Sequence, residues 1–64
     1  MQIDGNKLLT KRTELGITRA DVGHVMGVTY QRVEQLEKPG KHNMRPIILK
    51  AVAKLLNAKV EELI

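Results

Sequence analysis

The chain has 64 residues and no cysteine, so it has room for one small domain and for neither a disulfide nor a thiolate zinc site. Eleven lysines and arginines against seven acidic residues give a formal charge of +4, which favours a polyanionic partner. Hydrophobic residues make up 42% and a single tyrosine is the only aromatic, so the core must be built from aliphatic side chains and methionine.

The first predicted helix covers Gly5–Leu15, with Asp4 as its N-cap and Gly16 as the left-handed residue that ends it. Ile3, in the short lead-in before it, is expected to be buried. Three residues at helical spacing form the inward stripe of this helix: Leu8, Arg12 and Leu15.

An arginine on the buried side of a helix needs an opposite charge, because an unpaired buried charge is costly. Glu37 is the partner we predict for Arg12. It ends a later helix, where a negative charge opposes the helix dipole and should have another reason to be present. The expected ion pair ties the first helix to the end of the third; the alternative is that both side chains are simply exposed.

The stretch from Thr18 to Glu37 predicts two short helices joined by a tight turn at Gly27. Thr18 and Asp21 form a capping box, and Thr29 is a second N-cap candidate after the turn. Two helices with so short a connection cross steeply, as in a helix-turn-helix, which presents its second helix, here residues 30–37, to a DNA major groove. The residues expected to face inward are Val22, Met26, Val33 and Leu36.

Residues 38–45 are predicted to form an eight-residue surface loop, since Pro39 disfavours helical geometry before it and Gly40 permits a reversal. The loop is polar and basic apart from Met44, and no acidic residue occurs between Glu37 and Glu61. We expect phosphate contacts from this segment; the alternative is a solvated basic face.

A fourth helix is predicted to begin at Pro46 and to run to Leu56, with Asn57 as a left-handed C-cap and one last helical turn at residues 60–63. The expected fold is therefore all-α, with five short helices and no strands, in a single domain over residues 1–64. The inward stripe of the fourth helix is Leu49, Val52, Ala53 and Leu56.

Residues 8–37, with LGITR at 15–19 and VEQLE at 33–37, resemble the Cro/repressor-type (Xre-like) helix-turn-helix family, most of all the lambdoid phage repressors and Cro proteins. The resemblance extends over nearly the whole chain and implies a compact five-helix lambda-repressor-like DNA-binding domain. It also implies a salt bridge between Arg12 and Glu37. Two departures stand out: the 38–45 loop is longer than in the most similar repressors, and Gly23 stands where the family usually has alanine.

The outward side of the third helix carries the residues expected to contact DNA bases. Gln31 and Gln35 can each bind adenine through N6 and N7, Tyr30 can contact a thymine methyl group, and Glu34 can accept from cytosine N4 or reject wrong sites. The alternative for all of them is an ordinary polar helix face. The base-contact set is Tyr30, Gln31, Glu34 and Gln35.

Phosphates are expected at the amino ends of the second and third helices and along the basic loop. Arg32 can reach either a phosphate or a guanine, and His42 is another phosphate candidate. The set assigned to the DNA backbone, or to either role, is Thr18, Arg19, Thr29, Arg32, Lys38, Lys41, Asn43 and Arg45.

No catalytic or metal-binding pattern is found. The chain has no serine, no glycine-rich phosphate loop after a strand, and only two histidines, His24 and His42, without carboxylates at ligand spacing. No apolar run reaches membrane-spanning length, and the first residues lack signal-peptide character. We therefore expect a soluble, cytoplasmic protein that is not an enzyme and has no cofactor.

Together these features predict a sequence-specific, repressor-like transcription regulator that binds double-stranded DNA. It would cover a palindromic operator as a homodimer, with half-sites about 34 Å apart. The alternatives are an antitoxin or restriction-system controller with the same domain, and a protein-interaction module that has lost DNA binding. Five apolar residues near the carboxyl end are candidates for the dimer surface, which can depend on DNA to form, although some of the five must belong to the core: Ile47, Ile48, Val60, Leu63 and Ile64.

Overall fold

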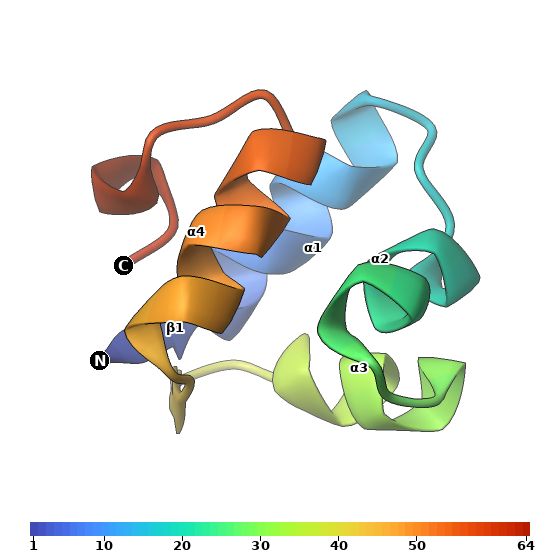
Figure 1. Ribbon diagram of the computed structural model, residues 1–64, viewed down its shortest axis with the longest axis horizontal. Coiled ribbons are helices and arrows are strands. Elements are labelled where there is room, and N and C mark those ends of the chain that lie inside the picture. The colour runs from blue at the N-terminus through green and yellow to red at the C-terminus, as the bar shows by residue number, and fades with distance from the viewer.

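The computed structural model describes residues 1–64 as four α-helices with a small antiparallel sheet of two strands. In Figure 1, α2 and α3 occupy one side of the molecule, while both ends of the chain lie on the opposite side. In chain order the elements are β1 (Gln2–Asp4), α1 (Gly5–Glu14), α2 (Arg19–Met26), α3 (Tyr30–Leu36), β2 (Lys41–Asn43), α4 (Pro46–Leu55) and the 3-10 turn η1 (Val60–Glu62).

The α2–α3 pair has the boundaries that its capping residues predict. Thr18 Oγ1 accepts from the Asp21 N–H at 3.1 Å, and an Asp21 carboxylate oxygen accepts from the Thr18 N–H at 3.2 Å, so the predicted capping box is confirmed. Gly27 ends α2 with φ 73°, the left-handed conformation that glycine adopts without steric cost. Thr29 then caps α3.

Helix α1 begins at its predicted cap, where Asp4 Oδ1 accepts from the Lys7 N–H at 3.1 Å. It ends one residue earlier than expected, and the prediction that Leu15 faces inward is wrong. Leu15 is the C-cap and is 48% exposed, because the chain leaves the helix there and turns at Gly16. The inward stripe is therefore shorter than the periodicity suggests.

One hydrophobic cluster joins all the helices to β1. It includes Ile3 and the predicted inward residues of α3 and α4, whereas Met26 is only partly buried against it. No helix of this structure is both long and apolar enough to cross a membrane. The buried hydrophobic residues are Ile3, Leu8, Val22, Val33, Leu36, Met44, Leu49, Val52, Ala53, Leu56 and Leu63.

The prediction that the chain contains no strands is wrong, whereas a helical turn is present where the last one was predicted. The last element is a single 3-10 turn, and β1 pairs with β2, in the segment predicted to be a loop, with Ile3 opposite His42. The Met44 N–H donates to the Met1 carbonyl at 2.9 Å, and the Gly5 N–H donates to the Gly40 carbonyl at 2.9 Å, so pairing extends beyond both strand ends. Residues 40–44 are thus held by main-chain hydrogen bonds to residues 1–5, which are distant from them in the sequence.

Gly5 stands where α1 meets the end of α3. A Cβ at this position would collide with the carbonyl oxygen of Lys38 and lie 2.9 Å from that of Leu36. Both are main-chain atoms, which cannot rotate away as a side chain can. The residue therefore allows the first helix to start directly against the chain that leaves α3.

Candidate nucleic-acid interface

Helix α3 divides into a buried side and a polar outward side. Val33 and Leu36 face the core, and Thr29 fixes the start of the helix by capping the Arg32 N–H at 3.4 Å. The four residues predicted to contact bases are all exposed, and Tyr30 at the start of the helix is 54% exposed. The exposed set is Tyr30, Gln31, Glu34 and Gln35.

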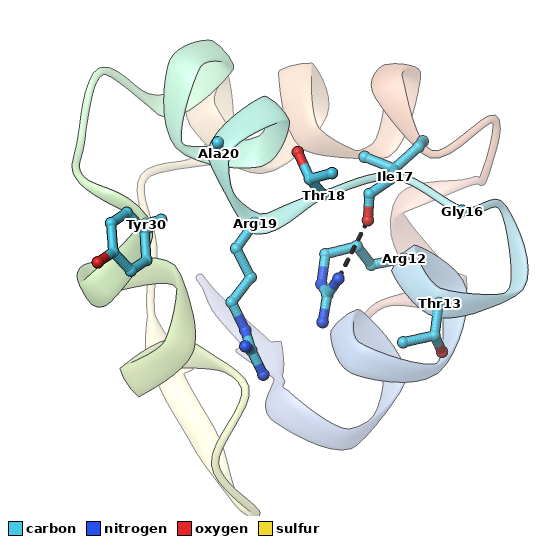
Figure 2. A pocket seen from close by; sticks show the side chains of 8 residues that line it. All are labelled: Arg12, Thr13, Gly16, Ile17, Thr18, Arg19, Ala20 and Tyr30. Atoms are coloured by element: carbon cyan, nitrogen blue, oxygen red, sulfur yellow. Dashed lines mark hydrogen bonds between the residues drawn. The ribbon is translucent and has the colours of Figure 1, made fainter.

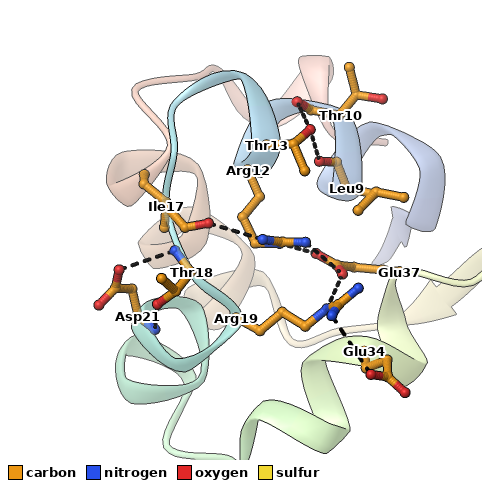
Figure 3. A network of polar contacts seen from close by, with 10 residues as sticks. All are labelled: Leu9, Thr10, Arg12, Thr13, Ile17, Thr18, Arg19, Asp21, Glu34 and Glu37. Carbon is orange, nitrogen blue, oxygen red and sulfur yellow. Dashed lines mark hydrogen bonds and ion pairs between the residues drawn. The ribbon is translucent and has the colours of Figure 1, made fainter.

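A buried carboxylate anchors the end of α3. Glu37 has only 3% of its side chain exposed and pairs with Arg12, whose Nε and Nη2 both donate to it, the latter at 3.2 Å. Arg12 Nη1 also donates to the Ile17 carbonyl at 3.0 Å. The predicted Arg12–Glu37 ion pair is therefore present, and it connects α1, the α1–α2 connection and α3 (Figure 3).

A second arginine shares this carboxylate, which the sequence analysis did not predict. Arg19 Nε donates to Glu37 Oε1 at 2.8 Å, and Arg19 Nη1 lies 3.7 Å from a Glu34 carboxylate oxygen. Hydrogen bonding to Glu37 is the main cause that raises the pKa of Arg19 above its ordinary value. In Figure 3 the Glu37 side chain lies between the two guanidinium groups, so two positive charges share one buried negative charge.

The turn between α2 and α3 depends on close backbone approach. A Cβ at Gly23 would lie 2.7 Å from the Val28 carbonyl oxygen, and the Val28 N–H donates to the Gly23 carbonyl at 2.9 Å. Glycine costs about 0.5–1 kcal/mol in a helix interior relative to alanine. Close packing of the turn against α2 is therefore the physical reason for glycine at this position.

The start of α2 and the start of α3 border an open hollow of about 520 Å³. In Figure 2, Tyr30 lies on one side of it and Thr13 and Gly16 on the other, while Arg12 and Arg19 extend between them. Thr18, whose hydroxyl caps α2, is also among the residues that line the hollow. Both arginines are paired with carboxylates here, Arg12 with Glu37 and Arg19 with Glu37 and Glu34.

β2 carries two of the residues predicted to contact the DNA backbone, and the side chains of both are bonded within the protein. Lys41 Nζ lies 2.8 Å from the Ile64 main-chain oxygen and 3.4 Å from an Asp4 carboxylate oxygen. Asn43 Oδ1 accepts from Gln2 at 3.2 Å. Lys41 and Asn43 are thus turned toward β1 and the end of the chain, away from α3.

The other basic residues in the 38–45 segment make fewer bonds within the protein. Lys38 and Arg45 are exposed and take part in no ion pair. His42 is half-buried, and its Nε2 lies 2.9 Å from the Lys38 carbonyl oxygen, so one of its ring nitrogens is occupied within the protein. Of the predicted loop contacts, the structure leaves Lys38 and Arg45 freest to reach a phosphate.

The apolar residues near the carboxyl end separate into core and surface. Leu63 is fully buried and therefore belongs to the core. Ile47 is 72% exposed and Ile64 is also exposed, while Ile48 and Val60 are half-buried against the core. The apolar surface available to a second subunit is thus centred on the first turn of α4.

No group of three or more histidine, cysteine or acidic side chains is placed to hold a metal ion. Comparisons with protein-family models, with curated proteins and with solved structures found no match to this chain.

Proposed function

We propose that this protein is a sequence-specific transcription regulator that binds double-stranded DNA, with α2 and α3 as a helix-turn-helix of the Cro/repressor type. The proposal rests on the outward side of α3, which carries polar side chains able to contact bases. The end of this helix is held in place by a buried carboxylate. A helix with its side chains is about 10–12 Å across, and the major groove is about 12 Å wide. Residues 30–37 accordingly fit as the recognition element.

The side chains at the exposed start of α3 suit direct reading of base pairs. Gln31 is exposed and its amide bonds to no other group of the protein, so both its oxygen and its nitrogen are available to adenine N6 and N7. The exposed ring of Tyr30 can pack against a thymine methyl group. Neither contact requires the protein to give up a bond of its own.

The hollow beside α3 supplies a site for the DNA backbone. A phosphate there would meet the Arg19 guanidinium, which extends from the start of α2. Arg12 and Glu37 act behind it as positioning residues, since they hold Arg19 and the end of α3 in place. Lys38 and Arg45 extend the positive surface toward the next stretch of backbone.

Repression would follow from occupancy of a promoter by a homodimer on a palindromic operator. Two copies about 34 Å apart would place both α3 helices in successive major grooves on one side of the DNA. Ile47 is the most exposed large hydrophobic residue and is the natural centre of a contact between subunits. The small area of this patch supports assembly on DNA rather than in free solution.

The test is a titration of the protein with DNA from upstream of its own gene and with random DNA, at several salt concentrations. Preference for one sequence, and a log–log salt slope of about −0.9 for each neutralised phosphate, are the expected results. Sedimentation with and without the preferred DNA measures dimer formation. Absence of any binding at low salt would contradict the proposal and favour a protein-interaction module.

A further inference from the structure

Two outward side chains of α3, Arg32 and Gln35, are hydrogen-bonded to each other. Arg32 Nη1 donates to Gln35 Oε1 at 3.3 Å, and both residues are exposed. Their spacing of three residues makes them neighbours on the helix surface. Because a guanidinium only donates hydrogen bonds, the amide atom beside it must be the oxygen, whichever way the amide group is drawn.

This bond uses one of the two lone pairs of the Gln35 oxygen and leaves the pair with more free donors than acceptors. Gln35 retains its amide N–H groups, and Arg32 retains the N–H groups not used in the bond. A glutamine that binds adenine must accept from N6 through its oxygen while it donates to N7. The Gln35 oxygen already accepts from Arg32, and the guanidinium beside it would confront the N6 donor of adenine with further donors.

Guanine presents the complementary pattern. Its major-groove edge carries two acceptors, O6 and N7, which an arginine can bind together. Gln35 lies on the side of α3 opposite Val33 and Leu36, so its bond draws the Arg32 guanidinium toward the part of the helix that would enter deepest into the groove. A phosphate contact would instead need the guanidinium at the flank of the helix.

We propose that Arg32 reads a guanine through O6 and N7, and that Gln35 is a positioning residue that holds its guanidinium. This inference rests on the proposed DNA-binding function and sharpens it. Gln31 keeps both amide atoms for adenine, whereas Glu34 is turned toward Arg19 and away from cytosine. The operator is thus expected to contain an adenine and a guanine read by neighbouring residues of one helix.

The experiment uses DNA selected by the full chain from a random pool. Each guanine of a half-site is replaced in turn by 7-deazaguanine, and each adenine by 7-deazaadenine, which lack the N7 acceptor. At one guanine the wild-type protein should lose roughly 5- to 150-fold in affinity, the range for a bidentate base contact. Arg32→Ala should bind the natural and the substituted DNA equally at that position.

Two variants of Gln35 separate positioning from direct reading. Gln35→Glu keeps an acceptor for Arg32, so it should retain the sensitivity to 7-deazaguanine even though its added charge weakens binding to all DNA. Gln35→Ala should reduce that sensitivity at the same guanine. Lys54→Ala, on the exposed side of α4, removes one positive charge far from α3 and is the matched control for charge; circular dichroism melts establish that each variant is folded.

Four results would overturn the inference. Equal weakening of selected and random DNA by Arg32→Ala would make Arg32 a phosphate contact. Loss of sensitivity to 7-deazaadenine in Gln35→Ala would make Gln35 an adenine reader in its own right. A wild-type protein that selects DNA but is indifferent to guanine N7 would overturn this inference alone, whereas a protein without any sequence preference would overturn the proposed function with it.

Discussion

Two polar surfaces of this protein differ in whether their side chains are already bonded to other groups of the protein. At the β corner, which we define as β1, β2 and Ile64, Lys41 bonds to Asp4 and Ile64, and Asn43 bonds to Gln2. On the outward side of α3, Tyr30 and Gln31 are left to solvent.

The difference separates groups that serve the fold from groups available to a partner. A group that must give up an internal bond before it binds a partner loses part of what it gains, whereas a free group does not. The β corner should therefore matter most for stability, and α3 for binding. Substitutions in the two regions test this division.

The largest effect is expected from Gly5→Ala beside the β corner. Alanine at the start of a helix normally stabilises a protein slightly, but here its Cβ would collide with main-chain oxygens. We expect a loss of about 3 kcal/mol in the free energy of unfolding, the upper part of the range for overpacking, measured by urea denaturation. The control is Asn6→Ala, which is exposed in the same turn. A Gly5→Ala variant with an unchanged free energy of unfolding would mean that the main chain around this residue can shift at little cost.

Removal of Arg12 should have the next largest effect on stability. Breaking a buried ion pair typically costs about 3–5 kcal/mol, and because Arg19 still pairs with Glu37 we expect about 2 kcal/mol for Arg12→Ala. Arg19→Ala, which removes the more exposed partner, should cost less. A double-mutant cycle with Glu37→Ala measures the coupling, and additive effects of Arg12→Ala and Glu37→Ala would disprove the pair's contribution.

The two regions should also differ in DNA binding. Gln31→Ala is expected to lose about 1–3 kcal/mol on a selected operator and little on random DNA, because it removes a base contact. Lys38→Ala should weaken both DNAs and reduce the salt slope by about 0.9. Lys41→Ala should change neither, because its ammonium group is engaged at the β corner.

The DNA-binding comparison can be decided by the salt slopes alone. An equal decrease for Lys38→Ala and Lys41→Ala would show that Lys41 leaves the β corner to bind a phosphate. The distinction drawn between bonded and free polar groups would then fail for this surface.

The parts of the structure that could be predicted from sequence are those fixed by nearby residues. Thr18 and Asp21 meet within one helical turn, and Gly16, Gly27 and Asn57 all adopt the left-handed conformation expected of them. The outward and inward sides of α3 follow from the same periodicity, so the exposed set was predictable once the caps were placed.

The parts that could not be predicted depend on contacts between distant residues. Neither Gln2–Asp4 nor Lys41–Asn43 has the length or the alternating apolar pattern of a strand, and the pairing joins segments that are far apart in the sequence. The bond from Arg19 to Glu37 was equally hidden, since the position of Arg19 at the start of α2 already had a functional explanation. When the sequence position of a charged residue already has one functional explanation, nothing in the sequence pattern indicates a second role.

The smallest effect is expected from acid at the β corner. The Lys7 main-chain N–H is the main cause that lowers the pKa of Asp4 below its ordinary value, and Lys41 adds to it. The stabilisation from ionised Asp4 is therefore complete above the unfolded pKa of about 3.9 and is lost as the pH falls through the lower folded pKa. Thermal unfolding of the wild type and Asp4→Asn, which keeps a capping side chain, should differ by a constant amount from pH 7 to about pH 4 and converge below it. A difference that stays constant to pH 2.5 would show that the Asp4 charge does not stabilise the corner.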